Sequence, residues 1–223
     1  MTVDIDPDAI ADEIARDIDA LATHTTQHVR AVRREHSRRL RDADGAEVLA
    51  IADALTATHR WVAYELVYNH RGAAAAVDRR WVTQLGRGLD GWASVDAFAR
   101  YISGPAWRRR QIPDDLVRGW ASSAERWWRR AAVVSTVPLN LRAAGGDGDT
   151  TRTLDICTRV VDDHDVMVVK ALSWALRELV TWDRDAVHAF LDDHHHVLAA
   201  RVRREVTNKL ETGRKDRVPR TNA

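Results

Sequence analysis

The sequence predicts an all-α protein built as a curved stack of antiparallel helical hairpins, an α-solenoid. Three observations support this fold class. Apolar residues recur at helical spacing along almost the whole chain of 223 residues, and no segment shows the alternating pattern of a strand. Glycine (11) and proline (5) are few and fall between the periodic segments. A globular helical bundle is the competing architecture, because no clean sequence period is visible.

The helices of the first half are bounded by capping residues and glycines. Asp6 followed by Pro7 is typical of an N-cap with proline at the first helical position. The helix that follows carries an apolar stripe through Ile10, Ile14 and Ile18. Further helices are expected over residues 29–42, 47–55, 58–69, 73–85 and 92–102.

The second half continues the same pattern. Ser122 and Glu125 have the spacing of a capping box, which predicts a helix carrying Trp127 and Arg130. The sequence AAGGDG at 144–149 is the clearest loop, and Asp183 is expected to cap a helix. Other helices are expected over 151–161, 166–181 and 195–211. We therefore expect one HEAT-like domain over 1–212, followed by a polar, disordered tail over 213–223.

Composition narrows the class of protein. The formal net charge is only +1, so charge alone does not indicate a nucleic-acid binder. Positive charge comes almost entirely from arginine, whose planar fork suits phosphate recognition. The single cysteine, Cys157, excludes a disulfide framework and a multi-cysteine metal site. No segment approaches the length of a membrane span and the N-terminus lacks an apolar signal region, so a cytoplasmic location is expected.

Tryptophan is frequent, with nine in the chain, and its usual role is packing in the core. Some of these tryptophans, however, lie three or four residues from a charged residue and so share a helix face with it. An aromatic ring beside a fixed charge suits a site for a cationic aromatic ligand next to phosphate. The pairs are Trp92 with Asp96, Trp127 with Arg130, and Trp174 with both Lys170 and Arg177.

Three segments around these pairs resemble motifs of the AlkD-type DNA alkylation repair proteins. Trp92-Ala-Ser-Val-Asp96 resembles the W-x-x-x-D segment of that family. The segment WWRRAA at 127–132 is similar to its W-x-x-R-A-A segment, and KALSWALRE at 170–178 is similar to its K-A-x-x-W-x-L-R-E segment. Order and approximate spacing agree, and the resemblance extends from about Thr58 to Leu210.

The resemblance implies HEAT-like helical repeats with a basic concave groove. It also implies a DNA glycosylase that removes N3- and N7-alkylated purines from duplex DNA, with no cofactor and no metal. Asp96 matches the catalytic carboxylate, and Trp92 and Trp174 match the aromatic pair beside the lesion. Arg130 matches a cleft arginine, which we count among the catalytic residues and expect to hold a phosphate.

Four further residues are expected to bind DNA. Arg177 matches a second cleft arginine, and Lys170 matches a basic position to which we assign a phosphate contact only. Trp127 and Arg129 belong to the second motif and are counted with them. The expected partner is double-stranded DNA containing alkylated bases, bound by a monomer.

The chemistry agrees with these residue types. A purine alkylated at N3 or N7 is already positively charged, so it can leave without protonation by a general acid. As the bond breaks, positive charge moves to the sugar, where a carboxylate can stabilise it and orient water. No lysine nucleophile is needed, which predicts a monofunctional enzyme that does not nick the strand.

Two alternatives stay open. A non-catalytic HEAT-like scaffold could bind DNA structures or a protein partner, but it has no reason to keep Asp96 together with both tryptophans. A plain helical bundle with buried tryptophans would instead pair Asp96 with Arg130 structurally or leave both dispensable.

Three other features are interpreted as structural. Consecutive residues on a helix point about 100° apart, so His194, His195 and His196 are not expected to converge on a metal. The acidic segment 162–165 is expected to cap a helical corner. Cys157 occupies an apolar helical position and is expected to be an inert core residue.

Overall fold

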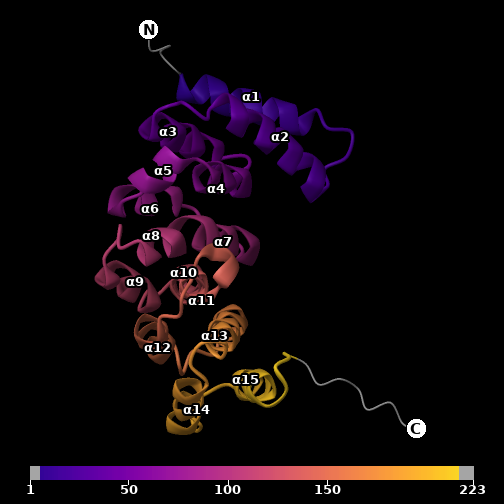
Figure 1. Ribbon diagram of the computed structural model, residues 1–223. Helices are drawn as coiled ribbons and strands as arrows, with labels where there is room; N and C mark the ends of the chain where they lie inside the picture. Colours follow the sequence, from indigo (N-terminus) through magenta and orange to yellow (C-terminus); the bar gives the residue numbers. More distant parts are fainter. Residues whose placement is uncertain (1–5, 216–223) are drawn as a thin grey trace, which may run out of the picture. The chain divides into compact units, whose positions relative to one another are not determined.

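The computed structural model describes residues 6–215 (Figure 1). All regular secondary structure in that range is helical and none is strand, which confirms the predicted fold class. The described residues divide into two compact units. The first contains the residues up to Leu89 together with Tyr101–Ile112, and the second contains Asp90–Arg100 and the residues from Pro113 onward. The single domain over 1–212 stays a prediction, as does the disordered tail, of which 216–223 lie outside the described residues.

The first unit is organised around α3, which packs on α1, α4 and α5, while α2 packs on α1 and α4. Side-chain caps begin several of these helices, with Asp6 capping α1, as predicted, and Asp44 forming a capping box with Glu47 at α3. The core includes the aliphatic residues Ile14, Ile18 and Leu49 and the fully buried rings of Tyr64 and Trp107. The helices are α1 (Pro7–Asp19), α2 (Thr26–Arg39), α3 (Gly45–Leu55), α4 (Arg60–Asn69), α5 (Arg71–Ala76), α6 (Arg79–Leu85) and α8 (Gly104–Arg108).

The second unit is organised around α10 and α13, which pack on each other. Helix α10 also contacts α7, α9 and α12, and α13 also contacts α11, α12, α14 and α15. This arrangement brings α7, α10 and α13, which carry the three sequence motifs, into one packed group. The helices are α7 (Trp92–Phe98), α9 (Asp114–Ala121), α10 (Arg126–Val134), α11 (Val137–Asn140), α12 (Thr150–Arg159), α13 (Val166–Leu179), α14 (Arg184–Asp193) and α15 (Ala200–Thr212).

Two predicted helices are interrupted. The expected helix over 73–85 is split into α5 and α6, because Asp78 leaves the helical conformation and its side chain caps the backbone N–H of Trp81. The expected helix over 92–102 is α-helical only to Phe98 and continues as a π-helix over Ala99–Ser103.

Two predicted helix starts are wrong. The capping box of Ser122 and Glu125 does not form, because Glu125 itself is the N-cap residue and makes no side-chain cap. The last helix begins at Ala200 rather than at 195, since the chain turns at His194–His196. Sequence reasoning missed α8, α9 and α11, each of which is preceded or opened by a proline. Within the described part of the chain, no helix has the length and apolar character needed to cross a bilayer.

Candidate active site

The centre of the candidate site is an ion pair between Asp96 on α7 and Arg130 on α10. The Arg130 guanidinium donates from Nε to Oδ1 and from Nη2 to Oδ2 of Asp96, each at 2.8 Å. The Arg130 side chain is 6% exposed and the Asp96 side chain 17% exposed. Two parallel hydrogen bonds hold the carboxylate in one orientation, while part of the Asp96 side chain stays exposed to solvent.

Arg130 also links the ion pair to α13. Its Nη1 donates to the backbone carbonyl of Met167, in the first turn of α13. One buried guanidinium therefore bridges α7, α10 and α13. Because its donors are used inside the protein, Arg130 is poorly placed to hold a phosphate, and we propose no phosphate contact for it.

The open face of α13 carries the third motif. Met167, Lys170, Trp174 and Arg177 follow one another at spacings of three, four and three residues, so they form one stripe along the helix. Each of these is partly or fully exposed, whereas the rest of α13 is largely buried. The stripe therefore begins at the residue that binds Arg130 and leads away from it toward Arg177.

Hydrogen bonds orient two members of this stripe. The indole Nε1 of Trp174 donates to Glu178 Oε1 at 2.9 Å, which fixes the ring on its helix. Arg177 Nε donates to Ser173 Oγ at 3.3 Å, and that hydroxyl donates to the buried Glu205 at 2.7 Å. Glu178 and Glu205 were not singled out from the sequence. The spacing of four residues between Trp174 and Glu178 was a signal for the first, but the 32 residues between Ser173 and Glu205 gave none for the second.

Trp92 differs from the other tryptophans in its exposure. It is the first residue of α7 and is 57% exposed, although it is one of the largest apolar side chains. The exposed part of an indole does not stabilise the fold by burial in the core, so it is available to contact a ligand. Asp96 lies four residues later, on the same face of α7.

The opposite side of α7 rests on an aromatic cluster. Phe98 is buried, with its ring centroid 6.1 Å from those of Trp120 and Trp128, and the two indoles are 5.1 Å apart. This cluster accounts for Trp128, the tryptophan next to the matched Trp127. It anchors α7 so that Asp96 faces Arg130.

Trp127 and Arg129 are held by other contacts. The Arg126 guanidinium lies 4.7 Å from the Trp127 ring centroid, and its Nη1 is 3.6 Å from Asp165 Oδ2. Arg129 donates from Nε to Asp163 Oδ2 at 2.6 Å and from Nη1 to two backbone carbonyls. The predicted DNA-binding role of these two residues therefore competes with structural partners.

The acidic corner and the cysteine match their structural interpretations. Asp165 caps α13 by accepting from the Met167 N–H, and Asp163 pairs with Arg129. Cys157 is fully buried, and burial strongly raises the pKa of its thiol, so it stays protonated and unreactive.

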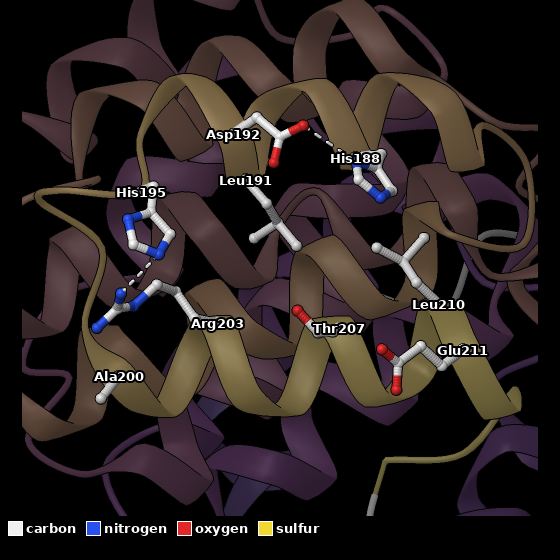
Figure 2. Close-up of a pocket in the computed structure, with 9 residues that line it drawn as sticks. All are labelled: His188, Leu191, Asp192, His195, Ala200, Arg203, Thr207, Leu210 and Glu211. Carbon is white, nitrogen blue, oxygen red and sulfur yellow. Dashed lines mark hydrogen bonds and ion pairs between the residues drawn. The ribbon is translucent and has the colours of Figure 1, made fainter.

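The three consecutive histidines do not gather at one point. The His194 ring packs on Phe190 with centroids 4.5 Å apart, while His195 Nε2 accepts from Arg203 at 3.0 Å. His195 and Arg203 lie at one end of a cavity of about 400 Å³ between α14 and α15 (Figure 2). None of the predicted site residues lines this cavity.

One group in the first unit has ligand types suited to a metal ion. Glu13, Asp17 and His36 place one donor atom each within 4.8 Å of one another. Arg39 already binds Glu13 at 2.6 Å, so a cation would have to displace a guanidinium. Sequence reasoning missed this group because it joins two helices.

The second unit is thus a helical unit in which an oriented carboxylate lies one helical turn from an exposed indole. Comparison with family models identifies the class further: residues 16–210 match the family described as DNA alkylation repair enzyme. The chain belongs to this family, and its role is in the repair of alkylated DNA. Comparisons with curated proteins and with solved structures found no match.

Proposed function

We propose that the protein is a monofunctional DNA glycosylase that hydrolyses the N-glycosidic bond of N3- and N7-alkylated purines in duplex DNA. The observation that carries this proposal is the Asp96 carboxylate, which is held by two hydrogen bonds from buried Arg130 and lies one helical turn from exposed Trp92. Family membership supports alkylated DNA as the substrate.

Asp96 is the catalytic carboxylate. When the cationic purine leaves, the sugar becomes an oxocarbenium-like ion, and a fixed negative charge lowers the energy of that state. Asp96 also orients the water that adds to the anomeric carbon, and it accepts the proton that this water loses. The cationic purine takes the electron pair of the broken glycosidic bond and leaves as a neutral base. It therefore needs no general acid to protonate it.

Arg130 is a positioning residue. Its bidentate contact removes rotational freedom from the Asp96 side chain, so the carboxylate does not have to reorganise during the reaction. Arg130 also lowers the electrostatic cost of keeping the carboxylate charged when DNA excludes water.

Trp92 and Trp174 supply the aromatic surfaces. A tryptophan face attracts cationic groups by roughly 0.5–2 kcal/mol, depending on how far water is excluded. Such a surface favours the cationic base before cleavage and the cationic sugar during it. Lys170 and Arg177, on the same stripe of α13 as Trp174, contact the backbone phosphates on either side of the lesion.

The test is to incubate the protein with duplex DNA treated with methyl methanesulfonate and to measure the released bases by mass spectrometry. We expect release of 3-methyladenine or 7-methylguanine above the spontaneous rate, and intact strands until the abasic sites are cleaved by alkali. Heat-denatured protein is the control. DNA binding without release above the control would favour the non-catalytic scaffold and exclude the glycosylase.

A further inference from the structure

The arginines of α9 and α10 contribute little net attraction for DNA. Each of them is paired with an aspartate of the second unit, so its charge is largely cancelled at the range over which phosphates are attracted. The pairs are Arg118 with Asp155 (2.6 Å), Arg126 with Asp165 (3.6 Å), Arg129 with Asp163 (2.6 Å) and Arg130 with Asp96 (2.8 Å). Apart from Lys170 and Arg177 of α13, attraction for DNA phosphates would have to come from cations outside these two helices.

The first unit contains a group of arginines and tyrosines that we call the arginine–tyrosine patch, formed by Arg30, Tyr68, Tyr101, Arg108 and Arg109. Arg30 Nη2 lies 3.5 Å from the Tyr101 hydroxyl, and the rings of Tyr101 and Tyr68 are 5.3 Å apart. Tyr68 in turn lies close enough to Arg109 to affect its pKa. Arg30 of α2, Tyr68 of α4 and Tyr101 of the π-helix are thus in contact, and Arg108 and Arg109 lie at the end of α8.

The charge of the patch is not balanced. Glu65 is buried beneath it and serves two arginines, with Arg30 Nη2 at 2.6 Å and Arg33 Nε at 3.4 Å. Neither Arg108 nor Arg109 forms an ion pair with any residue in the described part of the chain. The patch therefore carries more positive than negative charge.

Arg108 and Arg109 also have unused donors beyond the hydrogen bond that Arg109 Nε donates to Gln111 Oε1 at 3.0 Å. Arg108 Nε is buried and has no hydrogen-bond partner among residues 6–215. Partial burial and the neighbouring charge of Arg108 lower the pKa of Arg109, although a guanidinium still stays charged at neutral pH. Two neighbouring cations without a carboxylate partner, one of them with an unused donor, form a site that an anion would stabilise.

We propose that the arginine–tyrosine patch binds the phosphodiester backbone of duplex DNA, and the choice of duplex DNA as its ligand rests on the proposed function. The planar guanidinium of Arg109 can donate two parallel hydrogen bonds to one phosphate, and tyrosine hydroxyls are common phosphate donors. Contacts of this kind set affinity and register but carry no base specificity.

The experiment uses the full-length protein and an undamaged, fluorescein-labelled duplex. Affinity is measured by anisotropy over a series of potassium chloride concentrations for the wild type, for R108Q/R109Q and for R16Q/R41Q. The last variant is a matched control, because Arg16 and Arg41 are exposed arginines of the same unit and its charge change is identical. R109Q alone, at an exposed residue, replaces the double variant if thermal melting shows that the double variant is unfolded.

We expect R108Q/R109Q to bind more weakly and to reduce the slope of log affinity against log salt by about one unit for each phosphate that the variant no longer neutralises. R16Q/R41Q should keep the slope of the wild type, and R108K/R109K should restore most of it because it restores the charge. Equal slopes for the wild type and R108Q/R109Q, or an equal reduction in R16Q/R41Q, would overturn the proposal.

This test is separate from the test of the glycosylase. Binding to undamaged DNA needs no excision, so a protein that releases no base can still show the reduced slope. Conversely, if base release occurs but R108Q/R109Q leaves the slope unchanged, the glycosylase activity is supported and DNA binding by the arginine–tyrosine patch is excluded. For an active enzyme, R108Q/R109Q should raise the DNA concentration needed for half-maximal excision and leave the rate at saturating DNA unchanged.

Discussion

At the scale of single residues, the contacts of Arg130 decide what it can do. Helical spacing related Arg130 to Trp127, and the family resemblance implied a phosphate contact for it. Its side chain is instead 6% exposed and bonded to Asp96 and to the Met167 carbonyl. Such a pair is also what a plain helical protein would contain. The exposed Trp92 one turn away, on the same face of α7, is what favours a site.

Replacing Arg130 should therefore affect stability and rate more than DNA affinity. R130A leaves the Asp96 carboxylate without its partner in a largely buried place, which costs about 3 kcal/mol. Thermal or urea unfolding measures this loss, with R126A as the control because Arg126 is 54% exposed and its ion pair is longer. If the free energies of unfolding of R130A and R126A agree within about 0.5 kcal/mol, the ion pair of Arg130 with Asp96 does not stabilise the fold as proposed.

Tyr64 gives a prediction at high pH. Burial raises the pKa of Tyr64 to about 12, against the opposing effect of Arg60, and its hydroxyl donates to the Leu85 carbonyl at 2.8 Å. Because the folded-state pKa lies above the unfolded one, this stabilisation is complete below about pH 10 and is lost as the pH rises toward 12. In an absorbance titration at about 295 nm, Y64F should remove a component that ionises near pH 12. Loss of an earlier component instead would contradict the burial argument.

At the scale of elements, local capping chemistry was the most predictable part of the fold. Asp6, Asp165 and Asp183 cap α1, α13 and α14 as expected, because each acceptor lies two or three residues before the N–H that it binds. The break at Asp78 was missed because the alanines before it continue a helical pattern. The residue that interrupts the helix is an ordinary N-cap without glycine or proline to mark it.

The contact of α3 with α5 depends on a residue without a side chain. A Cβ on Gly45 would lie 2.6 Å from the backbone carbonyl carbon of Gly72, closer than packed atoms allow. G45A should therefore destabilise the protein by about 1–3 kcal/mol, because backbone must move. G119A is the control, since a Cβ there meets nothing within 4 Å and alanine favours a helix. Equal unfolding free energies for the two variants would show that α3 and α5 can separate at little cost.

At the scale of the whole molecule, the sequence predicted the helical class and the composition of the site but not its connections. Asp96 and Arg130 are 34 residues apart, Arg129 and Asp163 also 34, and Arg118 and Asp155 37. Each pair joins segments that are far apart in the sequence, so no local sequence pattern could have predicted it.

Charge distribution, like the contacts between distant residues, could not be predicted from the sequence. The formal net charge is +1, yet individual arginines differ in how far a carboxylate balances their charge. Those of α9 and α10 are paired with aspartates, whereas Arg108 and Arg109 of the first unit have no such partner in the described chain. A near-neutral total is therefore compatible with a strongly salt-dependent affinity for DNA.

The measurement that tests the proposed catalytic role most directly is single-turnover release of 7-methylguanine by D96N, compared with D163N. Asp163 is a matched control, because it is a half-buried aspartate paired with an arginine of the same helix, α10. We expect D96N to lower the excision rate by about 100-fold or more, with its affinity for DNA nearly unchanged, and D163N to stay close to the wild type. A folded D96N protein that releases base at the wild-type rate would contradict the assignment of Asp96.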